Sequence, residues 1–432
     1  MNRTTHLTRT CVLFCCLLAV AGTAADRFQF GEGKLQPGYS RVLPATLYNP
    51  QSGYGFENGA AVAAVEGACT SDKPFFFSVD VPEGNYNVKV TLGHPSAETV
   101  ATVKAESRRL MIERLPTAPG KFETRTFTVN VRSSEIGSGG SVRLKPREIG
   151  KLDWDHKLTL EFNGERPSVS ALEITRADDA ITVYLAGDST VVDQDQEPWA
   201  AWGQMLPRFF KPGVAIANHA ESGEALKSFV AERRLEKILS TIKAGDYLFI
   251  QFAHNDQKPG SAYLEPFTTY KEQLQHYIGE ARRRGAIPVL VTSMHRRSFG
   301  EDGTLTNTLG DYPAAMRQTA AEEKAALIDL NAMSKAFYEA LGPEGSTKAF
   351  VIYPAGTFPG QTGELKDNSH FNNYGAYELA RCIVEGIQAN KLGIAKFLAD
   401  DRAPFDPTRP DPPDRWSLPL SPVFTARRPE GS

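Results

Sequence analysis

The sequence has little of what marks several common classes of protein. Only 5 of its 432 residues are cysteine, and we expect no structural disulfide. The formal net charge is -3, so the chain lacks the basic excess that would favour nucleic acid as a partner. Beyond the N-terminus, no run is apolar enough to span a membrane. With 432 residues and 41% hydrophobic content, the chain is long enough for two globular domains.

The first 25 residues have the pattern of a secretory signal peptide. Arg3 and Arg9 give a positively charged start, residues 11–20 are apolar, and residues 21–25 are small enough for cleavage. The apolar stretch is too short for a retained membrane anchor. We therefore expect export to the periplasm or the extracellular space, with no membrane span in the mature chain.

Residues 26–176 have the pattern of an all-β domain. Strands are expected at 86–92, 124–129 and 157–162, with glycine, proline and asparagine between the apolar segments. Many short strands separated by turns predict a β-sandwich. The opening segment, 28–57, resembles the galactose-binding-like modules of secreted carbohydrate-active enzymes. Such a domain could bind a glycan, or it could only pack against the next domain, and the sequence leaves both roles open.

Residues 180–395 change to alternating strands and helices. Apolar strands are expected at 181–186, 214–218, 246–252, 287–292 and 326–330, and helices at 270–284 and 313–324. This alternation predicts an α/β domain with a mainly parallel sheet covered on both faces. Cys69 and Cys382, which remain after signal cleavage, then lie in different domains. Residues 396–432 are rich in proline and predict an extended arm over the surface or a disordered tail.

Several predicted apolar segments are followed by polar residues of the types that catalytic sites use. The first strand ends in Gly187-Asp188-Ser189-Thr190, at the carboxyl end where open α/β sheets place their sites. Ser222-Gly223, Ala253-His254-Asn255-Asp256 and Asp367-Asn368-Ser369-His370 follow later in the chain. A serine nucleophile needs an imidazole base, a carboxylate that orients the base, and donors for the oxyanion. These blocks contain all of those groups.

The four blocks resemble the SGNH, or GDSL-like, hydrolases. Ser189, Gly223, Asn255 and His370 match the four positions that name the family, and Asp367 matches the acid. The pattern looks most like the rhamnogalacturonan acetylesterases of carbohydrate esterase family 12. Ala253 stands where the family often has glycine, and the Ser222 block lacks the arginine that often follows its glycine. Both departures concern substrate detail rather than mechanism.

The resemblance implies a three-layer, flavodoxin-like fold and a set of residue roles. Ser189 would attack an acetyl carbonyl, His370 would act as base and then acid, and Asp367 would orient His370. The amides of Ser189 and Gly223 and the side chain of Asn255 would form the oxyanion hole. The resemblance implies neither a metal nor a cofactor.

Each of these residues also has a plainer interpretation. Gly-Asp-Ser-Thr is an ordinary turn or helix-cap sequence, and Asp367 is suited to capping a helix. His219, His254 and His295 also follow strands and are alternative bases. His370 is preferred because a carboxylate stands three residues before it, ahead of a predicted helix.

The substrate prediction is a carbohydrate ester. Arg296, Arg297 and Lys227 are candidates for binding an anionic polysaccharide, although each is also typical of a solvated surface charge. Trp199 and Trp202 are candidates for stacking on sugar rings, although their spacing favours the core face of a helix. The function predicted is an exported acetylesterase acting on acetylated pectin, with rhamnogalacturonan as the first candidate. Alternatives are an esterase of the same fold acting on lipid or aryl esters, and a non-catalytic glycan-binding protein.

Overall fold

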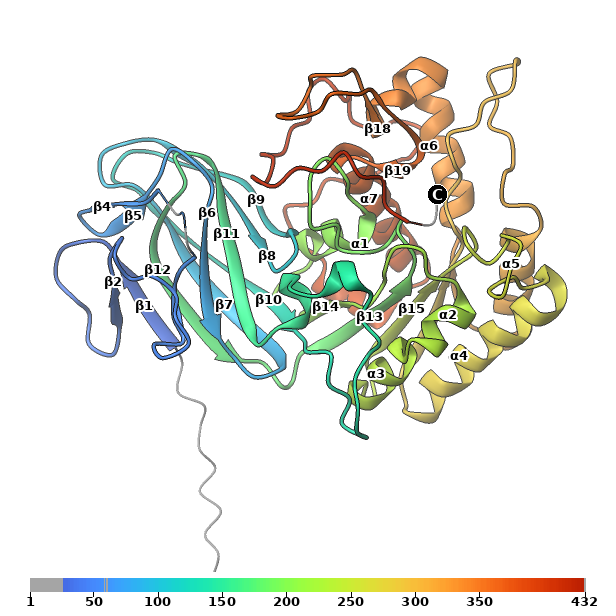
Figure 1. Cartoon of the computed structure of the whole chain (residues 1–432), viewed down its shortest axis with the longest axis horizontal. Coiled ribbons are helices and arrows are strands. Elements are labelled where there is room, and N and C mark those ends of the chain that lie inside the picture. Colours follow the sequence, from blue (N-terminus) through green and yellow to red (C-terminus); the bar gives the residue numbers. More distant parts are fainter. Residues whose placement is uncertain (1–25, 58, 60, 431–432) are drawn as a thin grey trace, which may run out of the picture.

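The computed structural model describes residues 26–57, 59 and 61–430. The predicted signal peptide lies outside the described residues. Two units lie side by side, a β-sandwich formed by the first part of the chain and an α/β domain formed by the rest (Figure 1). None of the described helices combines the length and apolarity needed to cross a bilayer.

The β-sandwich consists of two sheets that are mainly antiparallel. The first contains β1 (Asp26–Phe30), β2 (Ser40–Val42), β4 (Ala63–Val65), β5 (Ala68–Thr70), β7 (Gly84–Gly93), β10 (Phe122–Val131) and β12 (Ser168–Arg176). The second contains β3 (Tyr54–Phe56), β6 (Phe75–Asp80), β8 (Thr99–Ala105), β9 (Arg109–Thr117) and β11 (Lys157–Glu165). Alternate residues point inward, so Val88, Val90 and Leu92 of β7 are fully buried. The three strands expected from sequence lie within β7, β10 and β11.

The α/β domain is built on a five-stranded parallel sheet. Its strands are β13 (Ile181–Gly187), β14 (Val214–Asn218), β15 (Tyr247–Gln251), β16 (Ile287–Val291) and β17 (Ala326–Ile328), and their order is β14-β13-β15-β16-β17. Numbered along the domain, this is the 2-1-3-4-5 order of flavodoxin-like folds. The predicted fold class, a three-layer α/β domain after an all-β sandwich, is confirmed.

Helices cover both faces of the parallel sheet. They are α1 (Trp202–Met205), α2 (Leu226–Ala231), α3 (Arg234–Thr241), α4 (Lys271–Arg283), α5 (Tyr312–Glu323), α6 (Leu330–Gly345) and α7 (Asn373–Ala389), with short 3₁₀ or π turns η3 (Leu206–Phe209), η4 (Pro266–Tyr270), η5 (Ser346–Ala349) and η6 (Gly393–Phe397). In β13, Val183 and Leu185 pack in the core with α1, α6 and α7, whereas Tyr184 and Ala186 pack with α2 to α5. The strands are mainly apolar because both faces are covered.

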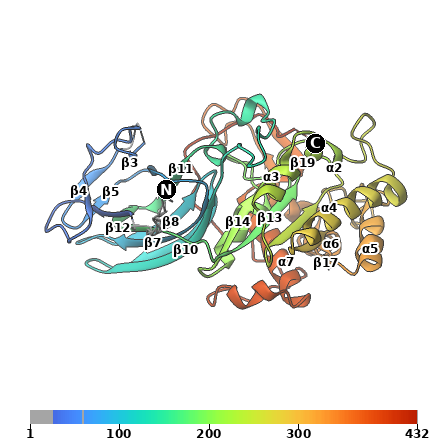
Figure 2. The ribbon, with the colours of Figure 1, turned by 90° about the horizontal axis from the view of Figure 1, so that it is seen from below.

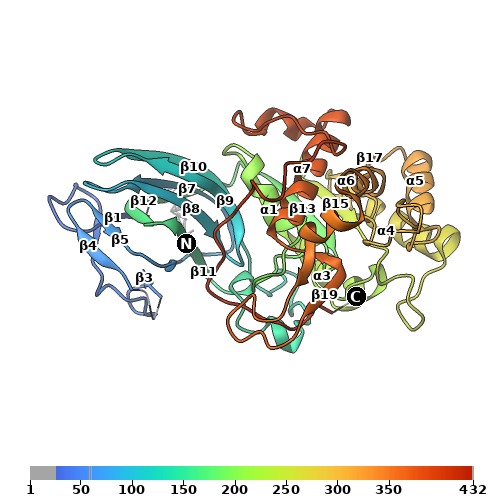
Figure 3. The same cartoon turned by 90° about the horizontal axis from the view of Figure 1, so that it is seen from above.

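Two segments without extensive regular structure connect the units. Residues 132–156 contain only η1 (Pro146–Glu148) and η2 (Leu152–Trp154) and lead from β10 to β11. Residues 398–430 contain no helix or strand, yet they run along the boundary of the two units and return to the α/β domain near β19 (Figure 3). Ser421 in this arm is buried and accepts a hydrogen bond from Lys104 Nζ of β8, 2.7 Å away.

The interface between the units is polar and buried. β10 lies beside β14, as the view from below shows (Figure 2). At the start of β9, the Arg109 side chain is 1% exposed, and its Nε donates to Asp193 Oδ2 across 2.6 Å. Its other nitrogens reach Asp153 Oδ1 at 3.2 Å and the carbonyl of Asn130 at 2.7 Å. Arg109 therefore links the sandwich, the connecting segment and the α/β domain.

Replacing Arg109 by methionine is expected to lower the free energy of unfolding by about 3 to 5 kcal/mol, because Asp193 would stay buried without its cation. Denaturant unfolding followed by fluorescence measures this change. Arg125→Met on β10 is the matched control, since Arg125 is 46% exposed and pairs only at the surface. An Arg109 variant as stable as the control would contradict the expected role of the interface.

Candidate active site

Three predicted residues form one hydrogen-bonded chain. His370 Nε2 lies 2.8 Å from Ser189 Oγ, and His370 Nδ1 lies 2.8 Å from Asp367 Oδ2. All three residues are at most 2% exposed. This is the arrangement that a serine nucleophile, an imidazole base and an orienting carboxylate require.

Ser189 is positioned by a tight turn at the carboxyl end of β13. The Asp188 carboxylate accepts hydrogen bonds from the amide of Thr190 at 2.9 Å and from its hydroxyl at 2.7 Å. The amide of Val191 donates to the carbonyl of Asp188 across 3.0 Å. Burial raises the pKa of Asp188 above its usual value, although these hydrogen bonds oppose the shift. The turn thus places Ser189 just beyond β13, where its hydroxyl meets the His370 ring.

Asp367 and His370 come from outside the parallel sheet, on the hairpin of β18 (Phe350–Tyr353) and β19 (Leu365–Phe371). The pairing shifts from Phe350 opposite Phe371 to Ile352 opposite Lys366, so β19 bulges between these pairs. Asp367 Oδ1 accepts the amides of Ser369 and His370 at 2.7 and 3.0 Å. The bulge therefore holds the Asp367 carboxylate against the His370 ring.

The Asp367 carboxylate is also bound by the C-terminal arm. Arg428 Nε donates to Asp367 Oδ2 across 2.6 Å, and Arg428 Nη2 donates to Oδ1 across 3.2 Å. Burial alone would raise the pKa of Asp367, but hydrogen bonds and charge from His370 and the two backbone amides lower it to about 2. Asp367 is therefore ionised at any pH near neutrality.

Gly223 and Asn255 lie on adjacent loops. Gly223 has a φ of +83°, a left-handed conformation that favours glycine. Asn255 Nδ2 donates one hydrogen bond, 2.9 Å long, to the carbonyl of Glu224. An amide nitrogen has two hydrogens, so a second donor remains for another acceptor.

The other candidate bases have different surroundings. Among the described residues, the side-chain hydrogen bond of Ser189 Oγ joins it to His370 alone. His219 lies buried with its ring 5.8 Å from both Trp154 and Tyr184. Burial lowers the pKa of His219 and of His254 well below the usual value, and it also lowers that of His295. These three rings are not placed to accept the Ser189 proton.

The three cations expected to bind substrate differ in burial and in hydrogen-bond partners. Arg296 is half-buried and donates to the carbonyls of His254 and Thr308, each at 3.3 Å. Arg297 bonds Ser346 Oγ and Asn368 Oδ1, each at 3.0 Å, and so braces the hairpin that bears His370. Lys227 is exposed on α2. Substrate binding by these residues remains a prediction.

The two tryptophans are both buried. Trp202 begins α1 and donates through Nε1 to Gln251 Oε1 across 2.8 Å. Trp199 precedes the helix, so the prediction that both belong to one helix face is wrong for Trp199. Its ring stands edge-on to the His370 ring, with centroids 5.9 Å apart. Trp199 therefore packs against the His370 ring.

A cleft of about 320 Å³ adjoins the three-residue chain, and sequence reasoning missed most of its lining. Trp199 and Ser222 come from the α/β domain, Arg147 and Lys151 from the connecting segment. Residues 425 and 427–430 of the arm complete it. The basic composition of 143–151 was the available signal, but such runs are also typical of solvated loops. Among the described residues, no group of acidic, histidine or cysteine side chains is arranged to hold a metal ion.

Comparison with known proteins defines the class. Residues 185–375 match the GDSL-like Lipase/Acylhydrolase family, and residues 26–131 match the Beta-agarase/YXIM esterase-like, galactose-binding domain-like family. The chain belongs to the GDSL-like lipase/acylhydrolase family, and it is a serine carboxylic-ester hydrolase.

Individual relatives refine this placement. The chain is 45% identical over 216 residues to rhamnogalacturonan acetylesterase RhgT of Bacillus subtilis (strain 168), covering 50% of this chain and 91% of the relative. It is 31% identical over 393 residues to the uncharacterized esterase YxiM of the same organism, covering 86% and 92%. The crystal structure of YxiM covers 85% of this chain and 99% of its own, with 29% identity and a TM-score of 0.46.

Proposed function

We propose that the protein is an exported carbohydrate acetylesterase that removes O-acetyl groups from a plant cell-wall polysaccharide, with acetylated rhamnogalacturonan as the first candidate. The observation that carries the proposal is the hydrogen-bonded chain from Ser189 through His370 to Asp367. The names of the relatives RhgT and YesY, which is 39% identical over 224 residues, support the substrate class.

The first half of the reaction forms an acetyl-enzyme. Ser189 Oγ attacks the acetyl carbonyl carbon while His370 Nε2 takes the hydroxyl proton, and Asp367 stabilises the imidazolium. The negative oxygen of the tetrahedral intermediate accepts hydrogen bonds from the amides of Ser189 and Gly223 and from the Asn255 side chain. The intermediate collapses, and His370 returns its proton to the departing sugar oxygen.

The second half releases acetate. A water molecule gives its proton to His370 Nε2 and attacks the acetyl carbon, through the same oxyanion site. Collapse of this intermediate expels Ser189 Oγ, which recovers the proton from His370. The proposed chemistry uses side chains and water for every proton transfer.

The character of the cleft favours a sugar over a lipid. Its lining includes four cations, Arg147, Lys151, Arg427 and Arg428. It also includes one tryptophan, Trp199. An acyl chain would require these charged groups to lose water without compensation, whereas sugar hydroxyls and carboxylates would hydrogen-bond to them.

Acetate release from a panel of substrates tests the proposal. The panel contains acetylated rhamnogalacturonan, acetylated xylan and a long-chain p-nitrophenyl ester, each with wild type and Ser189→Ala. We expect acetate from the acetylated glycans, fastest from rhamnogalacturonan, and none above background from the variant. Activity on the long-chain ester alone would instead identify a lipid or aryl esterase. No activity on any ester, with glycan binding retained by both proteins, would identify a binding protein.

A further inference from the structure

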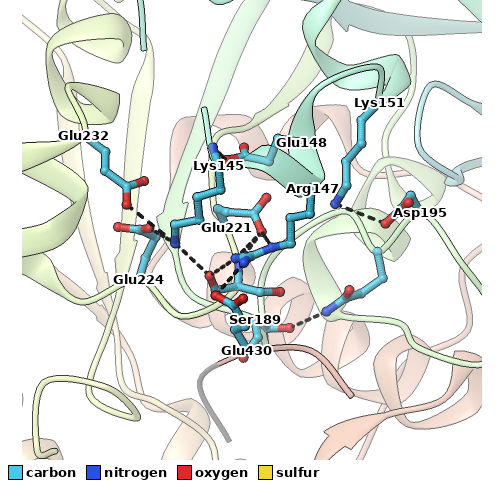
Figure 4. Close-up of polar contacts among 12 residues, drawn as sticks. Lys145, Arg147, Glu148, Lys151, Ser189, Asp195, Glu221, Glu224, Glu232 and Glu430 are labelled. Carbon is cyan, nitrogen blue, oxygen red and sulfur yellow. Dashed lines mark hydrogen bonds and ion pairs between the residues drawn. The ribbon is translucent and has the colours of Figure 1, made fainter. Parts of the chain in front are cut away.

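The cleft beside Ser189 is lined by cations from outside the parallel sheet. From the connecting segment of the β-sandwich, Arg147 reaches Glu221 and Lys151 reaches Asp195, and Ser189 lies close to Glu221 (Figure 4). Gln194 connects the cleft to the proposed nucleophile, because its Nε2 donates to the carbonyl of Ser189 across 3.1 Å.

Arg147 is held firmly on one side. Its Nε lies 3.1 Å from Glu221 Oε1, and its Nη2 donates to the carbonyl of Ser222 across 2.6 Å. Ser222 immediately precedes Gly223, so these contacts fix the guanidinium beside the proposed oxyanion glycine. The Arg147 side chain keeps 23% exposure, and Arg147 is one of the residues that line the cleft.

On the side away from Glu221, the Arg147 guanidinium binds the carboxylate of Glu430 in the C-terminal arm. Arg147 Nη1 lies 2.5 Å from Glu430 Oε2, and the Glu430 side chain is 52% exposed. Glu430 also lies over Gly223, since a Cβ placed on that glycine would be 3.4 Å from Glu430 Cβ and 3.7 Å from Oε2. A carboxylate on Arg147 therefore lies next to the proposed oxyanion site.

Most of the neighbouring cations have carboxylate partners of their own, but Arg427 is 78% exposed and shares Glu430, whose Oε1 lies 3.9 Å from Arg427 Nη2. Lys151 Nζ lies 3.1 Å from Asp195 Oδ1, and Arg428 holds Asp367. Lys145 contacts the buried Glu224 and donates to the carbonyl of Ser222 across 2.9 Å. Arg147 differs from Lys145, Lys151 and Arg428 because its outward partner is the half-exposed Glu430. It differs from Arg427 because Glu221 and the Ser222 carbonyl hold it in place. Its planar guanidinium suits a carboxylate.

We propose that Arg147 is a specificity-determining residue that binds the carboxylate of an acetylated uronate, and that Glu430 occupies this position in the free enzyme. The proposal rests on the proposed acetylesterase function and extends it to the substrate. The sandwich side of the molecule would then supply the group that distinguishes acidic from neutral sugars. Glu430 would compete with the substrate for the same guanidinium.

A pair of substrates that differ only in charge tests this inference. The probes are O-acetylated galacturonide oligosaccharides with free carboxylates and the same oligosaccharides as methyl esters. The measured quantity is the ratio of kcat/KM for acid over ester. In Arg147→Gln we expect this ratio to fall by about tenfold or more, the size of one charge-assisted hydrogen bond. A purely structural role would lower both kcat/KM values equally and leave the ratio unchanged.

Two further variants sharpen the test. Glu430→Gln should lower KM for the acid severalfold and leave KM for the ester unchanged, because a carboxamide competes weakly for Arg147. Arg282→Gln removes an equal charge from α4, where Arg282 is 42% exposed and pairs with Glu323, and should leave the ratio unchanged. An unaltered ratio in Arg147→Gln, or an equal change in Arg282→Gln, would overturn the inference. Wild type that releases acetate from neither probe would overturn the proposed function as well.

Discussion

Replacing Ser189 by alanine is expected to reduce acetate release by about 10⁴-fold or more, because removal of a nucleophile leaves only the contributions of binding and of the oxyanion donors. The loss should appear in kcat, since Ser189 Oγ is proposed to form a bond to the acetyl carbon only after the substrate is bound. Steady-state acetate release from an acetylated oligosaccharide measures the effect.

The same variant should remain folded. The Ser189 hydroxyl bonds His370 within the described part of the chain, and alanine fits the space that it leaves. Thermal unfolding should therefore match that of wild type. Ser52→Ala, in an exposed turn of the sandwich, is the control and should keep full activity. A Ser189 variant with more than one-tenth of wild-type activity would exclude this serine as nucleophile.

The second large effect is expected for Asp367→Asn, at about 10⁴-fold in kcat. Asp367 Oδ1 accepts two backbone amides, so the asparagine oxygen should occupy that position. The new NH₂ group then faces His370 Nδ1 and makes it an acceptor. The ring proton moves to Nε2, which points at Ser189 Oγ. An imidazole in this tautomer cannot take the serine proton.

Arg428→Gln is the matched control for that experiment. Arg428 also contacts the Asp367 carboxylate, but its removal leaves the hydrogen bond from Asp367 to His370 in place. Its effect on kcat should therefore be far smaller than that of Asp367→Asn. Equal losses in the two variants would show that charge around Asp367, rather than the His370 tautomer, controls the rate.

Sequence reasoning succeeded where the signal is local. The β13 strand and the turn at Ser189 are encoded by one continuous segment, in which an apolar run ends in Gly187-Asp188. The pairing of Asp367 with His370 is also local, because three residues separate them. The bulge in β19 that brings them together was not predicted, since it depends on pairing with β18.

The rest of the cleft depends on contacts between distant segments. Arg147 and Glu430 are separated by most of the chain, and nothing in the periodicity of either segment indicates that they meet. Glu430 lies in the proline-rich arm, for which the sequence predicts a lack of regular structure but no location. The position of the arm follows from side-chain bonds such as that between Lys104 and Ser421.

The buried charges between the two units limit how the chain can be divided. A fragment beginning near residue 180 would expose Asp193 and Glu197 to water without Arg109 and Arg108, their partners in the intact chain. The isolated sandwich would carry the unmatched arginines. Transplanting the hydrolase half into another protein would therefore require substitutions at positions 193 and 197.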